Sequence, residues 1–434
     1  MISRKSAKAQ KKRSSGKFHL LCAFALLRET VRGLFLAVSF ATLVGSVLAE
    51  EFLDGKNGRP LMLDQFRPRS SLVQPENRPQ RAKFPVVDVH VHPRLKFRHV
   101  PALLDAYVKV MDSQNIAVCV SLDGQLGEQL EEHKEYLWTK YRDRFVIFAN
   151  IDWQGTGERD DPATWDCHRA DFGRRMAVAL ADAKRRGAAG LKIFKTLGLR
   201  YRNPDGSLMA IDDPRWDPIW EACGKLQMPV LIHSADPVAF FQPVDRFNER
   251  WEELRRHPDW SYSGDKYPSH DELLAARNRV IKRHPQTIFI GAHVANYPEN
   301  LAEVGQWLEK YPNLHVDITA RIAELGRQPF TARKFFLEYQ DRILFGTDGP
   351  REPGRLLPYW RMLETRDEYF SYAYFSDTGD QYPPQGLWNI YGLGLPDEVL
   401  RKIYSENAAK LIPGVPERIK KYASSGSLGQ PAGP

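Results

Sequence analysis

Short apolar runs alternate with amphipathic stretches from Phe84 onward, and this alternation is the dominant pattern of the chain. Runs of this length, rich in Val, Ile and Phe, are typical of β-strands buried on both faces. The pattern predicts eight strands: Val86–Val91, Ile116–Val120, Phe145–Ile151, Gly190–Phe194, Pro229–Ile232, Thr287–Gly291, Leu314–Ile318 and Arg342–Phe345.

The stretches between these runs carry apolar residues at helical spacing. We expect helices at Pro101–Met111, Arg174–Arg186, Pro214–Leu226, Asp271–His284, Pro298–Lys310 and Thr331–Tyr339. Strands that alternate with helices predict an α/β fold with a parallel sheet. Eight repeats over residues 84–413 predict a (β/α)8 TIM barrel. The alternative, a doubly wound open sheet, usually has a Gly-rich loop after its first strand, where this chain has His90-Val91-His92-Pro93.

Two long insertions are expected, after strands five and eight. They span Asp236–His270 and Pro350–Ile390, and both are rich in aromatic residues. In a barrel both would lie at the carboxyl ends of the strands, where active sites are built. We expect most of these aromatic side chains to pack the loops against the body, and a few to line the pocket.

The first 49 residues differ from the rest of the chain in charge. The chain has 62 Lys and Arg against 54 Asp and Glu, and nine of the basic residues but one acidic residue lie in this segment. The remainder therefore has 53 of each sign, which excludes the clustered cations that nucleic acid binding needs.

A basic stretch, an apolar run at Leu34–Leu48 and small residues up to Ala49 are typical of a signal peptide. We expect export to the periplasm or the exterior after cleavage near Ala49. The alternative is an uncleaved N-terminal membrane anchor, and membrane contact is expected only through it. Residues 50–83 are predicted to be a linker or arm, and residues 414–434 a disordered tail. The four cysteines include no Cys-x-x-Cys pair, so no disulfide framework is implied.

His90 and His92 are the strongest chemical signal in the sequence. Residues two apart in a strand point to the same side, so the two imidazoles should lie side by side at the end of the first strand. Asp88 should share that face one step deeper. Two neighbouring imidazoles are poor packing partners but good ligands for a transition metal.

Three later strand ends carry residues of the same kind. His233 follows the fifth apolar run, His293 the sixth and Asp348 the eighth. A polar side chain in such a position is costly to bury unless it is paired or coordinated. Because parallel strands end on one rim, the three should lie near the His90–His92 pair.

With these motifs the chain resembles the amidohydrolase superfamily, within it the amidohydrolase-related group that includes aminocarboxymuconate semialdehyde decarboxylase. The resemblance covers about residues 84–413 and includes Phe345-Gly346-Thr347-Asp348-Gly349-Pro350. It implies one divalent metal, with Zn2+ expected and Mn2+ or Fe2+ as alternatives. It also implies the ligands His90, His92, His233 and Asp348, and catalytic roles for His293 and Asp348.

Four further residues near the strand ends are candidates for binding a small-molecule substrate. They are Lys192, Arg94, Arg321 and Asp236. In dinuclear members of the superfamily a carbamylated Lys bridges two metals at the position of Lys192, but here we favour a pocket cation or ion pair. Asp317 is a candidate to support a ligand. The remaining histidines show no ligand spacing.

Three functions remain open at this point. The first is a metal-dependent hydrolase of an amide, lactone or ester bond. The second is a nonoxidative decarboxylase, for which the same ligand set would serve. The third is a barrel that binds a ligand without catalysis, against which the complete ligand set argues. The sequence also leaves a homo-oligomer open.

Overall fold

The computed structural model describes residues 55–66, 68–349, 353–372, 385–386 and 388–424. Contacts divide the chain into two compact units, residues 1–73 and residues 74–434. In the first, the described residues form two short 3-10 helices, Lys56–Gly58 and Leu63–Gln65. In the part of the chain that is described, no helix is both long and apolar enough to cross a membrane. The predicted leader, residues 1–49, lies outside the described residues.

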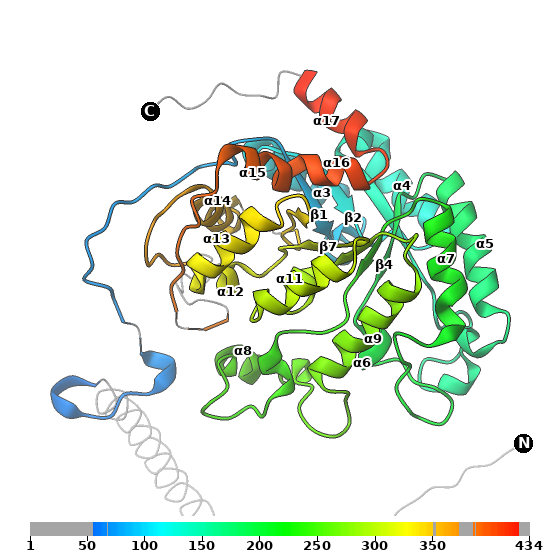
Figure 1. Cartoon of the computed structure of the whole chain (residues 1–434), viewed down its shortest axis with the longest axis horizontal. Helices are drawn as coiled ribbons and strands as arrows, with labels where there is room; N and C mark the ends of the chain where they lie inside the picture. Colours follow the sequence, from blue (N-terminus) through cyan, green and yellow to red (C-terminus); the bar gives the residue numbers. More distant parts are fainter. Residues whose placement is uncertain (1–54, 67, 350–352, 373–384, 387, 425–434) are drawn as a thin grey trace, which may run out of the picture. The chain divides into compact units, whose positions relative to one another are not determined.

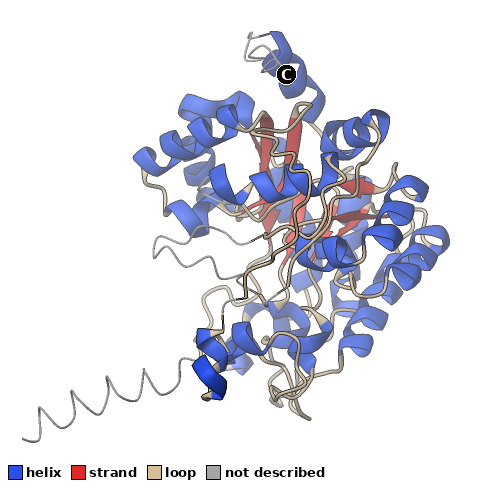
Figure 2. Ribbon diagram, turned by 90° about the vertical axis from the view of Figure 1, so that its left-hand side faces the viewer, coloured by secondary structure: helices blue, strands red, loops and turns tan. Residues whose placement is uncertain are grey.

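The second unit is built on eight parallel strands in the order β1 to β8. The strands lie in the interior of this unit with helices around them (Figures 1 and 2). Two backbone hydrogen bonds join the last strand segment to the first: Val89 donates to Phe345, and Asp348 donates to His90. The predicted barrel is thereby confirmed, and all eight strands lie within two residues of their expected bounds. They are β1 Val86–Val91, β2 Ile116–Ser121, β3 Phe145–Asn150, β4 Gly190–Ile193, β5 Val230–Ile232, β6 Phe289–Gly291, β7 Leu314–Asp317 and β8 Ile343–Leu344.

A main helix follows each of the first seven strands and packs around the sheet (Figure 2). These are α3 Pro101–Ser113, α4 Gly127–Tyr141, α5 Phe172–Arg185, α7 Asp217–Lys225, α9 His270–Arg283, α11 Leu301–Lys310 and α13 Pro329–Glu338. Local sequence explains their starts. Proline occupies the first turn of α3, and Ser269 with Glu272 forms a capping box at α9.

Short helices flank the strand ends and fill the longer connections. They are α2 Pro93–Phe97, α6 Thr196–Leu199, α8 Trp251–Arg256, α10 Ala292–Ala295, α12 Ile322–Arg327, α14 Leu357–Glu364, α15 Asp397–Arg401 and α16 Asn407–Leu411. The segment between β5 and α9 contains α8, and its Phe240 and Tyr262 are buried. After β8, Tyr359 and Trp360 of α14 are buried, whereas residues 350–352, 373–384 and 387 lie outside the described part.

The barrel is filled with side chains. One cluster of buried apolar residues joins strand positions such as Val87, Val118, Leu231, Ile290 and Leu344. The same cluster includes residues of the C-terminal segment: Ala408, Ile412, Val415 and Tyr422. The C-terminal segment is therefore part of the core.

The predicted disordered tail is wrong for its first part. Residues Val415–Ser424 form helix α17, and Val415 and Tyr422 are buried. Val415, Ile419 and Tyr422 recur at intervals of four and three residues, which gives the helix one apolar face. Residues 425–434 lie outside the described part.

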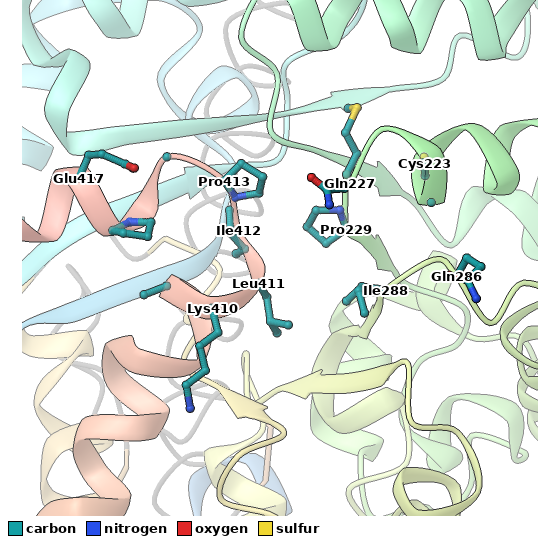
Figure 3. Close-up of a pocket in the computed structure, with 15 residues that line it drawn as sticks. Cys223, Gln227, Pro229, Gln286, Ile288, Lys410, Leu411, Ile412, Pro413 and Glu417 are labelled. Carbon is teal, nitrogen blue, oxygen red and sulfur yellow. The ribbon is translucent and has the colours of Figure 1, made fainter.

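A cavity of about 670 Å³ lies at the opposite end of the barrel from the strand carboxyl ends (Figure 3). Pro229 and Ile288, which line it, directly precede β5 and β6, and Leu411 and Pro413 close it from the C-terminal segment. The predicted site residues are not among those that line it.

Candidate metal centre

Three donor side chains converge where β1 and β8 end. His90 lies in β1, His92 directly follows it, and Asp348 lies in the loop after β8. One donor atom from each lies within 4.8 Å of the others. The rings of His90 and His92 are 5.3 Å apart, and His92 Nε2 lies 3.7 Å from Asp348 Oδ1. Three of the four predicted ligands are therefore side by side.

His90 forms a hydrogen bond with a carboxylate on β7. Its Nδ1 lies 3.0 Å from Oδ2 of Asp317, and both side chains are buried. Because a carboxylate accepts, Nδ1 carries the proton and Nε2 keeps its lone pair. Burial, with Lys192 nearby, lowers the pKa of His90 well below its usual value, so the imidazole is neutral. Asp317 was a candidate for this supporting role.

His92 has an equivalent partner that the sequence analysis did not single out. Its Nδ1 lies 2.6 Å from Oδ1 of Asp123, in the loop after β2. The other oxygen of Asp123 accepts hydrogen bonds from the backbone N–H groups of Arg94 and Leu95, at the start of α2. Asp123 follows a buried strand just as Asp348 does, so the signal for it was present.

Asp88 ties the loop that carries Asp348 to β1. Its Oδ1 accepts from the backbone N–H groups of His90 and Thr347, each at 3.1 Å, and its Oδ2 accepts from the Thr347 hydroxyl. Burial raises the pKa of Asp88 to about 7. Asp348 itself adopts a left-handed backbone with φ of 72°, and Lys96 Nζ lies 3.5 Å from its Oδ1.

His233 lies near the three donors, with His293 beside it. Among the described residues, the three-residue donor group does not include it. Its Nε2 lies 3.0 Å from the carbonyl oxygen of Ala235 and 3.5 Å from Oδ1 of Asp236. Burial lowers the pKa of His233 to about 4.

The His293 ring lies between the ring of His233 and the ring of His90. It is 4.4 Å from the His233 ring and 5.0 Å from the His90 ring. Its Nδ1 lies 2.8 Å from the Thr319 carbonyl oxygen, so Nδ1 donates and Nε2 is left as an acceptor. Burial lowers the pKa of His293 well below its usual value.

Lys192 is a buried cation beside these histidines. Its side chain is 1% exposed, and within the described part of the chain its Nζ has no hydrogen-bond partner. Burial lowers its pKa to about 8, and the carboxylates of Asp317 and Asp348 oppose that shift. A buried ammonium in this state is suited to binding an anionic group.

The other three predicted pocket residues differ in their surroundings. Asp236 forms an ion pair with Lys195; burial raises its pKa, but Lys195 and His233 bring the net value below the usual range. Arg321 is buried, and its Nη1 donates to its neighbour Ala320. The side chain of Arg94 contacts Gln129 and Glu132 of α4.

The donor set fits a divalent metal ion. Two imidazoles and a carboxylate are the kinds of ligand that zinc and related ions prefer. Each imidazole has its Nδ1 bound to a carboxylate, which fixes the ring and leaves Nε2 for the ion. His90, His92 and Asp348 are thus able to hold one.

Comparison with known proteins identifies the family. A family model described as Amidohydrolase matches residues 87–414. No curated protein matches. Among solved structures, 2,6-dihydroxybenzoate decarboxylase from Rhizobium is similar, with 18% identity over 76% of this chain and 98% of that chain and a TM-score of 0.43.

Two more structures are similar at the same level. Dihydroxybenzoic acid decarboxylase from Polaromonas sp. JS666, with bound manganese and the inhibitor 2-nitroresorcinol, shares 17% identity over 76% of this chain and 96% of that chain, with a TM-score of 0.44. 4-Oxalomesaconate hydratase from Rhodopseudomonas palustris shares 12% identity over 79% and 99%, with a TM-score of 0.42. The match of the family model spans about three quarters of the sequence, and the chain therefore belongs to the amidohydrolase family.

Proposed function

We propose that this enzyme is a metal-dependent hydrolase of an amide, lactone or ester bond in a small molecule. The observation that carries the proposal is the His90, His92 and Asp348 group, in which both imidazoles are oriented by carboxylates. A divalent ion held there would lower the pKa of a coordinated water and polarise a carbonyl oxygen. We propose Zn2+ for this ion, since two imidazoles and one carboxylate form a common catalytic zinc set.

We propose His233 as a further ligand. In support, it follows β5 on the same rim, and its ring packs on His293, which in turn packs on His90. On binding the ion, His233 would give up its hydrogen bond to Ala235.

His293 and Asp348 are proposed to manage protons in the reaction. His293 is neutral, and its hydrogen bond to Thr319 leaves Nε2 able to accept a proton or a hydrogen bond from the substrate or water. Asp348 is half-buried beside His92, so its carboxylate can reach both the ion and a reacting group.

Nonoxidative decarboxylation is the second candidate, and Lys192 is the observation that favours it. A buried ammonium without a hydrogen-bond partner in the described part of the chain is able to hold a substrate carboxylate. Arg321, also buried, and the Lys195–Asp236 pair are proposed to contribute to the same pocket. Arg94 would have to leave Gln129 and Glu132 to take part.

One experiment separates the two reactions. The metal-loaded enzyme is incubated in H2(18)O with panels of lactones, esters, amides and aromatic carboxylic acids, and products are analysed by mass spectrometry together with released CO2. A hydrolase incorporates 18O into a product carboxyl group and releases no CO2. A decarboxylase releases one CO2 per substrate consumed, and an enzyme inert towards every panel would contradict both candidates.

We also propose that the protein is exported, on the strength of the leader in the sequence. N-terminal sequencing of protein from the native host should begin at Glu50. A chain that begins at Met1 and sediments with membranes would indicate the anchored alternative.

A further inference from the structure

His293 begins a turn whose backbone is in the left-handed conformation. Four consecutive residues without a glycine have positive φ: His293 at 57°, Val294 at 58°, Ala295 at 50° and Asn296 at 59°. The left-handed conformation brings Cβ close to the following carbonyl oxygen, and it normally occurs at single residues. Val294 is β-branched, which makes this conformation still less favourable there. The turn therefore depends on contacts from outside itself.

The turn is also tightly folded onto the end of β6. A Cβ placed on Gly291 would lie 2.8 Å from the Cβ of Ala295 and 2.9 Å from its Cα. Only glycine fits at that point. The backbone N–H of Asn296 donates to Ala292 at 2.8 Å, which closes the turn locally.

One external contact comes from Arg277 on α9. Its guanidinium Nη1 donates to the carbonyl oxygen of Ala295, and its Nη2 donates to Asn278 Oδ1 at 2.9 Å. The side chain is fully buried and packs over the Trp307 ring at 4.7 Å. No carboxylate pairs with it within the described part of the chain, and burial lowers its pKa to about 9. A buried cation is costly without an anion. The hydrogen bonds of the Arg277 guanidinium to the Ala295 carbonyl and to Asn278 offset part of that cost.

Two further hydrogen bonds fix the far end of the turn. His270 Nε2, also on α9, lies 2.9 Å from the carbonyl oxygen of Asn296. The Asn296 side-chain oxygen accepts from the backbone N–H of Ser234, the residue after His233, at 3.0 Å. The turn thus links α9 to the segment that carries His233.

The turn determines where the His293 ring lies. The backbone N–H of His293 donates to Asp317 Oδ1 at 2.9 Å, and the same carboxylate holds His90 through its other oxygen. An extended or right-handed backbone at residues 293–296 would carry the ring away from its position between His90 and His233.

We propose that Arg277 is a positioning residue, which holds the left-handed turn at residues 293–296 and so places the His293 imidazole against His90 and His233. This inference rests on the proposed function only in giving His293 a part in the reaction. The geometric claim stands apart from the identity of the substrate.

The test compares three variants of the full chain: Arg277→Met, Arg277→Lys and Arg342→Met. Arg342, which directly precedes β8, is a matched control. Its guanidinium also donates to backbone carbonyls, those of Tyr311 and Leu314. Lysine at position 277 keeps a donor for the Ala295 carbonyl, whereas methionine keeps only the apolar stem.

Two readouts report on the turn and on the ring. Amide hydrogen exchange of the peptide containing Asn296 and Tyr297 should be at least about ten-fold faster in Arg277→Met than in wild type, and within about two-fold of wild type in Arg342→Met. The ring Cε1–Hε1 NMR signal of His293, assigned by its loss in His293→Gln, should shift in Arg277→Met and return towards its wild-type position in Arg277→Lys.

The opposite results would overturn the inference. If Arg277→Met loses thermal stability but keeps the exchange rate of this peptide and the His293 signal, Arg277 only stabilises the fold. If the Arg342→Met control moves the His293 signal equally, the effect is not specific to the turn. Metal content and turnover of the wild type test the proposed function separately, since neither enters these two readouts.

Discussion

Asp123 Oδ1 lies 2.6 Å from His92 Nδ1, so the imidazole of one proposed metal ligand is oriented by a carboxylate from the neighbouring strand end. His90 has the same arrangement with Asp317 at 3.0 Å. Each ring is thereby fixed in the form that offers Nε2. The candidate metal centre therefore depends on residues at the ends of four strands, β1, β2, β7 and β8, and not on the two histidines alone.

Removal of the Asp123 carboxylate should weaken metal binding without abolishing it. In Asp123→Ala the His92 ring loses its orienting acceptor, and α2 loses the acceptor of two backbone N–H groups. We expect the Kd of the divalent ion to rise by about 10–100-fold, the usual effect of losing such a partner. Chelator competition measures it. Asp105→Ala, which removes an exposed carboxylate paired with Lys140, is the control, and an equal loss of affinity there would refute the assignment.

His90 and His293 should respond differently to truncation. His90→Ala removes a donor of the three-residue group and should lose the metal and all turnover. His293→Ala should keep the metal, because its ring lies outside that group, yet lose turnover by about 100-fold or more, as expected when a general acid–base group is removed. Metal analysis and assay of the same preparations give both values. Equal metal loss in the two variants would show that His293 is a ligand.

The buried ammonium of Lys192 should lower the free energy of unfolding of the protein, although we propose that it binds the substrate. Its pKa falls from 10.5 to about 8 on folding, so below pH 8 the folded state carries a buried charge at a cost that disappears above pH 10.5. The metal-free Lys192→Met variant should therefore be more stable than metal-free wild type at pH 7 by up to about 3 kcal/mol. This advantage should shrink as the pH rises from 8 to 10.5. Chemical denaturation at several pH values measures it.

A compensating loss is expected in the same variant. Lys192→Met should raise KM for an anionic substrate. Methionine has a side chain of similar length to lysine, so the main change is the loss of the positive charge. A stabilised variant with unchanged KM would mean that Lys192 does not contact the substrate.

His133 should make the fold sensitive to acid. It is buried on α4, with Nε2 2.8 Å from Ser121 Oγ and Nδ1 2.9 Å from His99 Nε2. Burial lowers its pKa from 6.5 to about 3, so the unfolded state binds the proton first as the pH falls. Its contribution to stability is full above pH 6.5 and is lost as the pH falls towards 3, on the order of several kcal/mol.

The pH dependence of unfolding, compared between wild type and His133→Gln, measures this contribution of His133 to stability. The unfolding free energy of the variant should be lower at pH 7.5, and the difference should narrow between pH 6.5 and 4. A difference that is constant over this range would contradict the assignment. His257→Gln, at an exposed position, is expected to follow wild type throughout.

The strands could be predicted from the local pattern of the sequence, and so could the three donors of the candidate metal centre. Val-rich runs with a two-residue period place His90 and His92 together, and the shared rim of a parallel barrel brings Asp348 beside them. Asp123 carried the same signal as Asp348. However, an Asp after a strand also suits a turn, and its contact with His92 depends on which strands are neighbours.

Other features depend on tertiary contacts that no local pattern encodes. Val294 disfavours the left-handed backbone that it adopts, and the turn exists because Arg277, His270 and Ser234 hold it from other segments. His233 turns its Nε2 to a carbonyl two residues away, which is a choice of rotamer. Gly414 and Pro416, before and at the start of α17, suggest the end of ordered structure. The burial of Val415 and Tyr422 against the barrel nevertheless keeps the segment helical.

The metal content of the wild-type protein tests the account most directly. Protein purified without chelators should contain one tightly bound divalent ion per chain by elemental mass spectrometry, held by His90, His92 and Asp348. Dialysis against a chelator should remove the ion and the activity together, and Zn2+ should restore both. Fully folded, active protein that contains no divalent ion would contradict the account.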